Sequence, residues 1–561
     1  MNKIKRTLLP IFIITALLLS ACGSTPAELT YESALKWVEE STLDENGYYA
    51  VSEELIFAIQ NTEYTAPKNI IYMIGDGMGS NIIQATQEKY ADELYGNKLA
   101  INYLTQVGTH NSYSASDKIT DSAAGGTALA TGHKTSNYTV GMDTTHTINY
   151  KSVLELAAEK GKSTGIIATK SVTDATPAAF TAHVEDRLLQ NAIAKQQLVK
   201  IADGTLDLVL GGGSEYYEFF DNEAEFEAAE EKGMSYSEKW EDTLDDKLPL
   251  VGLYARDALN TTAAYLPTLA EMTDFALKML SEDENGFFLM VEGSQIDSMA
   301  HDNDLEKEIH EMYQFDNAIA VAMRYVALHP DTLLIVTADH ETGGLYFPEA
   351  GYGEGKDYIY LSEEHTSVNV PVFALGYGVE ALDVIKENTD IAGFVAAALG
   401  EEDFGQESKV TKLFDGKGDK TIKLSFDESI TNAELLTNAA MIDEFRSQLA
   451  STVNARALHL VVRNAGEETV TLPALKIQTA SGTSYDAVPQ CAYINAGETL
   501  TLAYVLPVEL WQSNAFSNVN SIQISYDVVA ENAWKNTFGY NKEVAELEIE
   551  EIYITDRVLE Q

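Results

Sequence analysis

The stretch KNIIYMIGDGMG, residues 68–79, decides the fold. Its apolar centre contains β-branched residues and is closed by Gly-Asp-Gly, a pattern typical of a buried parallel strand that runs into a tight loop. Similar apolar runs recur near residues 164–170, 207–213, 287–293, 332–344 and 370–378. Helical patterns such as SVLELAAEKG and LAEMTDFALKML separate them. This alternation predicts an α/β protein, a three-layer α/β/α arrangement with a mainly parallel central sheet.

Polar residues follow the predicted strands. They are Asp76, Asp174, Glu292, Asp339 and His365. Ligand sites of open α/β sheets lie at the carboxyl ends of the strands. We therefore expect these carboxylates and this imidazole to lie at one edge of the sheet.

Two short segments combine carboxylates with histidines. In VEGSQIDSMAHDND, Asp297 and His301 are four residues apart, so on a helix they share one face. In TADHETGG, Asp339 and His340 follow a strand directly, and in a loop both can turn to one ion. Oxygen and imidazole ligands suit a divalent metal. Such pairs are more often surface neighbours when taken singly, but three of the ten histidines lie beside strand-edge carboxylates.

The segment TDSAAGGTALATG, residues 120–132, predicts a helix with almost no side-chain bulk behind Asp121 and Ser122. One interpretation is close packing of this helix, and the other is that a ligand must approach Ser122. A serine at a helix N-terminus lies beside backbone N–H groups that can bind an anion.

The segment TDATPAAFTAHVEDR, residues 173–187, begins after a predicted strand. Pro177 suits the first turn of a helix, and we expect this helix to carry His183 and Arg187. The guanidinium of Arg187 could hold two oxygens of a phosphate in fork geometry. Taken alone, an arginine at this position is more often a surface residue.

Six motifs, taken in order, resemble those of the alkaline phosphatases. They are GDGMG, DSAAGGTALATG, TDATPAAFTAH with VEDR, VEGSQID with MAH, TADHETGG and the HT of EHTSVNVPVF. The resemblance runs from about Asn69 to Gly400. It implies an alkaline-phosphatase-like fold and the release of phosphate and an alcohol from small-molecule phosphomonoesters. It leaves the oligomeric state open, with a homodimer as one option.

The resemblance also implies roles for single residues. Ser122 would be the nucleophile that is transiently phosphorylated, and Arg187 would bind the phosphate. Two zinc ions and one magnesium ion per chain are implied. Their ligands would be Asp297, His301 and His365 for one zinc, Asp76, Asp339 and His340 for the other, and Asp76, Thr176 and Glu292 for magnesium, with Asp174 holding a magnesium-bound water.

Other functions stay open at this point. A phosphodiesterase or a sulfatase of the same superfamily is the main alternative. However, Ser122 is not followed by Pro as in sulfatase relatives, and diesterases usually lack an arginine like Arg187. A non-catalytic surface-binding lipoprotein is a third interpretation, against which the full set of matched ligands argues. Ser298 stands where many relatives carry Lys, His or Trp, so phosphate affinity and pH optimum are not predicted.

The first residues predict export and a lipid anchor. A basic start is followed by an apolar segment, residues 8–20, that is too short to span a bilayer, and then by LSAC. This pattern resembles a bacterial lipoprotein signal, residues 1–21, with acylation at Cys22. The protein would then be attached to the outer face of the cell membrane through the lipid only. The alternative is an ordinary secretory peptide with an incidental cysteine.

Composition and charge limit the classes of binding partner, and changes along the sequence indicate the domain boundaries. A formal net charge of −50 excludes binding to nucleic acid by general attraction, and an anionic substrate would need a local positive site such as bound metal. After the signal we expect a tether and helical segment at 22–66, the phosphatase domain at 67–402 and a linker at 403–418. Short alternating segments predict an all-β, sandwich-like domain of unknown role at 419–561.

Overall fold

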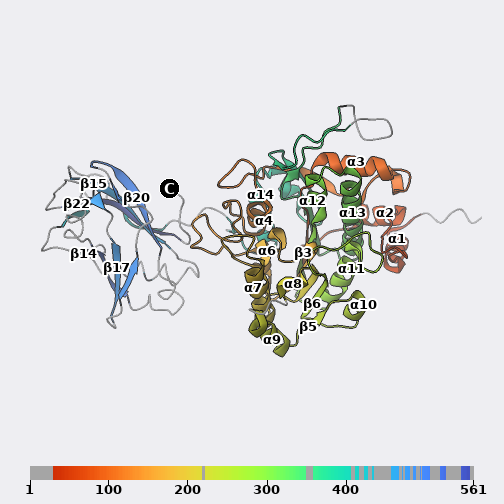
Figure 1. The fold of residues 1–561 in the computed structure, drawn as a ribbon, viewed down its shortest axis with the longest axis horizontal. Coiled ribbons are helices and arrows are strands. Elements are labelled where there is room, and N and C mark those ends of the chain that lie inside the picture. Colours follow the sequence, from red (N-terminus) through yellow and green to blue (C-terminus); the bar gives the residue numbers. More distant parts are fainter. Residues whose placement is uncertain are drawn as a thin grey trace, which may run out of the picture. The chain divides into compact units, whose positions relative to one another are not determined.

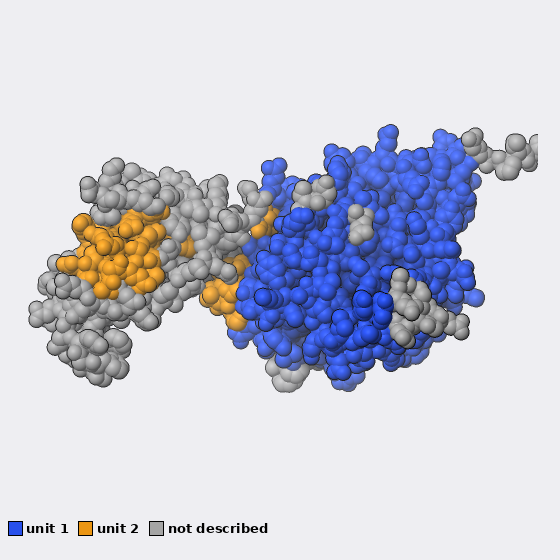
Figure 2. Space-filling view, turned by 90° about the horizontal axis from the view of Figure 1, so that it is seen from above, with its two compact units in different colours: residues 1–141, 151–402 blue, residues 142–150, 403–561 orange. Residues whose placement is uncertain are grey.

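The computed structural model describes residues 29–402 except 218–221 and 349–357, then 404–405, Arg446 and parts of 411–555 that are mostly strands. The chain forms two compact units, unit 1 with residues 1–141 and 151–402, and unit 2 with residues 142–150 and 403–561 (Figure 2). The predicted signal and Cys22 lie outside the described residues. Within the described part, no helix is long and apolar enough to cross a membrane.

Nine strands of the described part of unit 1 form one sheet. Their order is β2 (Thr105–His110), β11 (Val370–Leu375), β8 (Thr332–Thr337), β1 (Asn69–Gly75), β7 (Phe287–Gly293), β3 (Ser163–Ser171), β4 (Leu208–Gly212), β6 (Leu250–Ala255) and β5 (Ser235–Ser237). Strand β11 pairs antiparallel with both neighbours, and the other pairs are parallel. The mainly parallel sheet expected from the sequence is confirmed.

Helices cover both faces of this sheet (Figure 1). Those named below are α1 (Tyr31–Glu40), α2 (Glu53–Asn61), α4 (Ser122–Thr131), α6 (Ala175–Thr181), α11 (Leu269–Leu280), α12 (Gln295–His301) and α13 (Leu305–Leu328). The remaining described helices are α3 (Ser80–Tyr90), α5 (Val153–Glu159), α7 (Gln190–Asp203), α8 (Ser214–Tyr217), α9 (Glu223–Glu231), α10 (Trp240–Thr243) and α14 (Asn388–Ala398), with 3-10 turns η1 (Tyr95–Asn97), η2 (Ala100–Tyr103) and η4 (Val379–Val384).

Strand β1 shows why the sheet needs two helical layers. Every residue of the strand is buried, and successive side chains point to opposite faces. Ile71 and Met73 belong to the core that α1, α2, α11 and α13 complete. Tyr72 faces the other layer, where its hydroxyl donates to Leu129 O of α4 at 3.3 Å and its ring packs edge-on against Phe180 of α6. An apolar strand of this kind is stable only between two covering layers.

Helix α4 packs unusually close to its neighbours because it carries glycines. Asp121 caps its N-terminus by accepting from Ala124 N at 3.0 Å. A Cβ at Gly125 would lie 3.1 Å from Asp339 O, and one at Gly126 would lie 3.2 Å from Thr176 Cα. Close packing therefore accounts for the small residues, and it places the helix directly behind two strand-end segments.

One local expectation is wrong, and three strands were not anticipated. Helix α6 ends at Thr181, so His183 and Arg187 lie in the following loop and not on the helix. The helix stops because Ala182 is extended and Val184 pairs with Val140 in an isolated bridge. Strands β2, β5 and β6 were not anticipated: β2 and β5 are short and partly polar, and β6 is a short apolar run, LVGLYA.

The described strands of unit 2 form antiparallel sheets. One contains β12 (Thr411–Asp415), β13 (Ile422–Phe426), β15 (Ala457–Asn464), β20 (Thr499–Val505) and β22 (Ala545–Thr555); a second contains β14 (Asn432–Glu434), β17 (Ala474–Thr479), β18 (Ser484–Ala487) and β21 (Val519–Ser525); β16 (Val470–Thr471) pairs with β19 (Tyr493–Ile494). Leu458, Leu460, Val462 and Asn464 alternate along β15 and are buried, as expected for a core face, and His459 between the first two is buried as well. Strand β12 pairs with β22, so the segment expected to be a linker contains a strand.

Candidate active site

Four neighbouring strands bring carboxylates to one edge of the sheet. Strands β8, β1, β7 and β3 lie side by side, and in their shared register Ile74 of β1 is opposite Glu292 of β7. Asp76 and Asp339 follow the ends of β1 and β8, and Asp174 follows β3. All four carboxylates lie at the carboxyl ends of the parallel strands, as the sequence predicts.

A first group of possible metal ligands combines one carboxylate with two imidazoles. Oδ1 of Asp297 lies 3.3 Å from His301 Nε2 and 3.4 Å from His365 Nε2, and the two imidazole nitrogens are 3.1 Å apart. Asp297 and His301 come from one face of α12, and His365 lies on β10 (His365–Thr366), which pairs with β9 (Glu341–Thr342). The hydroxyl of Thr342 donates to Asp297 Oδ1 at 2.6 Å and thereby fixes the carboxylate.

A second group lies beside the first. His340 Nε2 is 3.1 Å from Asp339 Oδ2 and 3.6 Å from Asp76 Oδ1. Asp76, Asp339 and His340 are all buried, and their ligand atoms lie within 4.8 Å of one another. His340 is also within that distance of Asp297 and His365, so the two groups adjoin.

Three buried polar atoms at this edge make no hydrogen bond within the part of the chain that the structure describes. Asp76 Oδ1, Asp339 Oδ2 and Thr176 Oγ1 are buried and accept no hydrogen bond from the described residues, although His340 Nε2 lies near the two carboxylate oxygens. A buried polar atom without a partner is costly, and a cation bound to these oxygens would satisfy them. The donors therefore fit divalent metal ions.

The charge balance of the site leads to the same conclusion. Burial raises the pKa of Asp76 well above its usual value, and the neighbouring carboxylates of Asp339 and Asp297 raise it further. Burial also raises the pKa of Glu292 to about 8, although the Ser294 hydroxyl donates to it. The carboxylate of Asp297 raises the pKa of His301 to about 9 through a hydrogen bond. A divalent ion would supply the positive charge that these carboxylates otherwise take from protons.

Ser122 lies between these groups and the start of α4. It is 2% exposed, and its Oγ is 3.1 Å from His340 Nε2. As the first residue of α4 it stands where backbone N–H groups have no partner inside the helix. A nucleophilic oxygen, a possible metal group and an anion-binding helix terminus thus meet at one position.

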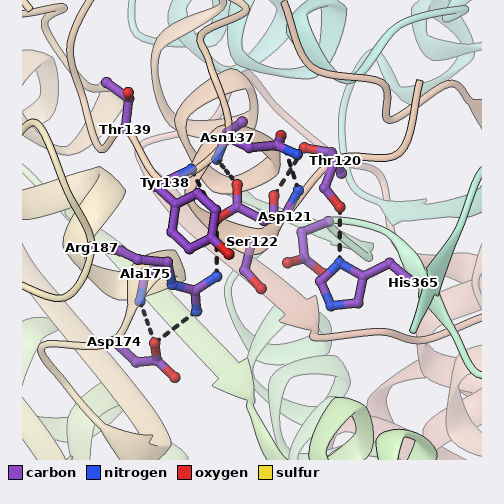
Figure 3. A network of polar contacts seen from close by, with 12 residues as sticks. Thr120, Asp121, Ser122, Asn137, Tyr138, Thr139, Asp174, Ala175, Arg187 and His365 are labelled. Carbon is purple, nitrogen blue, oxygen red and sulfur yellow. Dashed lines mark hydrogen bonds and ion pairs between the residues drawn. The ribbon is translucent and has the colours of Figure 1, made fainter. Parts of the chain in front are cut away.

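Arg187 reaches the site from its loop and is held by two carboxylates (Figure 3). Nη1 is 3.2 Å from Asp121 Oδ2, and Nη2 is 2.9 Å from Asp174 Oδ1. Burial works against its charge, but Asp174 and Asp121 outweigh it, so the pKa of Arg187 lies above its usual value. The guanidinium is therefore a fixed positive charge close to Ser122.

Three residues of the site were not singled out from the sequence: Asp121 as the partner of Arg187, Thr342, and Lys170 at the end of β3. Lys170 Nζ lies 2.8 Å from Asp174 Oδ2, so Asp174 binds two cations. Burial would raise the pKa of Asp174, but Lys170 and Arg187 hold it below its usual value. Of the site residues predicted from the sequence, the structure brings together Ser122 and the possible metal ligands Asp76, Asp297, His301, Asp339, His340 and His365, and it pairs Arg187 with Asp174. Cys22 lies outside the described residues.

The fold and the site define a class of protein: an α/β protein with groups of possible metal ligands, a buried serine and an arginine at the carboxyl edge of its sheet. The family model described as Alkaline phosphatase matches residues 67–361. Alkaline phosphatase 3 of Bacillus subtilis (strain 168) is 34% identical over 377 residues, which cover 64% of this chain and 73% of that protein. Alkaline phosphatase 4 of the same organism is 35% identical over 369 residues, covering 62% of this chain and 78% of that protein.

A solved structure agrees with these sequence relatives. The alkaline phosphatase from the Antarctic bacterium TAB5 superposes with a TM-score of 0.54 at 30% identity, covering 60% of this chain and 99% of that one. This chain belongs to the alkaline phosphatase family. It is an alkaline phosphatase enzyme, and the family is metal-dependent and acts on small-molecule phosphomonoesters.

Proposed function

We propose that the protein hydrolyses phosphate monoesters through a phosphoserine at Ser122, with two zinc ions and one magnesium ion per chain. The observation that carries this proposal is the position of Ser122. Its Oγ lies beside the ligand group of His340, at the N-terminus of α4, and Arg187 binds the residue that caps the same helix.

The proposed ligand sets follow the two groups at the sheet edge. Asp297, His301 and His365 would hold one zinc ion, and Asp76, Asp339 and His340 the other. Magnesium would bind Asp76, Thr176 and Glu292, with Asp174 holding a water of that ion. When bound, two divalent ions stabilise the negative charge that develops on the attacking and leaving oxygens.

The chain's own residues account for the rest of the reaction. Ser122 Oγ forms a bond to phosphorus while the bond from phosphorus to the ester oxygen breaks, and the alcohol leaves and takes a proton. Arg187 holds two phosphate oxygens in fork geometry, and the backbone N–H groups at the start of α4 neutralise charge on the same phosphate. Water then attacks the phosphoserine, which releases inorganic phosphate and restores Ser122.

The test is phosphate release from an aryl monoester by the protein lacking residues 1–22. Ser122→Ala should lower kcat by about 10³-fold or more, because no other nucleophile stands at that position. Ser214→Ala is the matched control, since Ser214 is also a buried serine at the start of a helix and should leave the rate unchanged. Metal-free protein should be inactive and should recover with zinc plus magnesium.

Two outcomes would refute the proposal. Metal-loaded wild type that releases no phosphate from monoesters but cleaves diesters or sulfate esters would assign a different substrate class. Activity that survives Ser122→Ala undiminished would mean that the nucleophile is another group.

We also propose that the protein is exported and anchored to the cell membrane by a lipid on Cys22. The basic start, the short apolar segment and the LSAC sequence support this. Labelled fatty acid should enter the wild-type chain and not Cys22→Ser, and the variant should leave the membrane fraction. A Cys22→Ser chain that stays membrane-bound and labelled would contradict the anchor. A homodimer is one oligomeric state to be tested by light scattering.

A further inference from the structure

Tyr138 has a backbone conformation that is rare for its side chain. Its φ is +71°, in the left-handed region. The other described non-glycine residues with positive φ are Asn97, His146 and Asn303. Asparagine and histidine visit this region more readily than bulky residues, for which it is an outlier that points to a functional role.

Tyr138 bonds the residues that surround the proposed phosphate position. Tyr138 N donates to Asp121 Oδ2 at 3.1 Å, and Tyr138 O accepts from Arg187 N at 2.8 Å. The same Asp121 caps the helix that starts at Ser122 and binds the Arg187 guanidinium. The backbone of Tyr138 is therefore held in place by the residues that position the proposed nucleophile and the proposed phosphate ligand.

The side chain of Tyr138 is open to solvent although its backbone is fixed. It is 56% exposed, whereas Ser122 is 2% exposed. Figure 3 draws its ring in the same close-up as Ser122 and Arg187. A large aromatic ring that is carried by a fixed backbone beside the proposed phosphate site and left uncovered is a surface on which a bound molecule can lie.

We infer that Tyr138 forms a binding surface for the alcohol part of the substrate and favours monoesters whose alcohol is a planar aromatic group. This inference rests on the proposed function, because it assumes that phosphate is held between Ser122 and Arg187. The alcohol part then extends from the fixed phosphate toward solvent, where the ring of Tyr138 lies. A flat ring can stack on tyrosine and a small aliphatic alcohol cannot, which is expected to change relative affinity about two- to tenfold.

The test uses variants that separate the ring from the backbone. Tyr138→Phe keeps the ring, and Tyr138→Asn removes it with a residue that tolerates positive φ. Tyr265→Asn is the matched control, because Tyr265 is 75% exposed and has no part in the site. In the metal-loaded protein, kcat/KM is measured for phenyl phosphate and for glycerol phosphate. Inhibition constants are measured for phenylphosphonate and methylphosphonate, which report binding without turnover.

The expected result is a loss of affinity for the aromatic ligand only. Tyr138→Asn should weaken phenylphosphonate about two- to tenfold, leave methylphosphonate nearly unchanged and lower the ratio of kcat/KM for the aryl to the alkyl ester. Tyr138→Phe and Tyr265→Asn should retain wild-type ratios. Equal effects on both phosphonates, or no effect on either, would overturn the inference while wild-type monoesterase activity still stood. Loss of the proposed function itself would appear as wild-type protein that hydrolyses neither ester.

Discussion

Buried carboxylates occur in two regions of unit 1, and they differ in what satisfies them. On α13, Glu311 accepts from the Thr261 hydroxyl, and Asp316 accepts from the backbone of Ala100 and Ile101 at 2.8 and 2.9 Å. At the sheet edge, Asp76 and Asp339 each keep one buried oxygen that accepts no hydrogen bond from the described residues, although His340 Nε2 lies near both. Burial alone therefore does not mark a functional acid. The difference is whether the protein supplies the partner or leaves it to a bound ion.

The largest expected effect is that of removing metal ions. Each ion present at a thousand times its Kd adds about 4 kcal/mol to the free energy of unfolding, so chelation should abolish activity and lower Tm by many degrees. Calorimetry of chelated and reloaded protein measures this. Glu311→Gln should show the same metal-dependent rise in Tm as wild type, whereas Asp339→Asn should show a smaller one. An equal metal-dependent rise in Tm in both variants would contradict the difference between the carboxylates of α13 and those of the sheet edge.

Removing a partner on α13 should destabilise the protein whether or not metal is present. Asp316→Ala leaves the N–H groups of Ala100 and Ile101 buried without acceptors, at a cost of about 3 kcal/mol. Asp316→Asn keeps one acceptor oxygen and should cost less. Denaturant unfolding with and without metal measures both. A loss seen only in the metal-loaded protein would mean that Asp316 acts through the ion sites after all.

The contribution of Glu311 to the free energy of unfolding should decrease as the pH rises. Burial raises its pKa to about 7, above the value of about 4.3 expected in the unfolded chain. Stability is therefore highest when the folded carboxyl is protonated, and it falls as the pH rises from about 4 through 7. Glu311→Gln should match wild type near pH 4 and be more stable by about 4 kcal/mol at pH 9. A difference between the two that does not grow with pH would contradict this account.

The smallest effect expected here concerns Lys170. Its ammonium lies 2.8 Å from Asp174, close to the proposed magnesium ligands, and should weaken cation binding there. Lys170→Met should therefore tighten magnesium binding about tenfold, measured by titration calorimetry on the zinc-loaded protein. Lys162→Met is the control, because Lys162 bonds backbone carbonyls at the other end of the same strand. Weaker magnesium binding in Lys170→Met would show that Lys170 mainly orients Asp174.

The sequence predicts much of the fold because the central strands are buried on both faces. Runs such as IIYMI have no solvent-facing positions, so a continuous apolar sequence reveals both the strand and the position of its carboxyl end. The polar edge strand β2, TQVGTH, carries no such signal. The contacts of Asp121 with Arg187 and of Lys170 with Asp174 depend on where Arg187 and Asp174 lie in the fold, so no sequence pattern predicts them. The segment HVEDR contains no helix breaker, and long-range contacts hold it out of α6: Val184 pairs with Val140, and His183 bonds Gln196 and Gly141.

The hydrogen bonds that build the site span very different lengths of chain. Asp121 lies 17 residues from Tyr138 and 66 from Arg187, whereas Ser122 is 218 residues from His340 and Gly77 is 262 from Asp339. Closing longer loops costs more entropy. The contacts of Asp121 with Tyr138 and Arg187 can therefore form before the proposed metal ligands come together. Ions that bind only after that late step would slow unfolding and leave the refolding rate nearly unchanged. The metals would then act on the lifetime of the folded enzyme more than on how fast it forms.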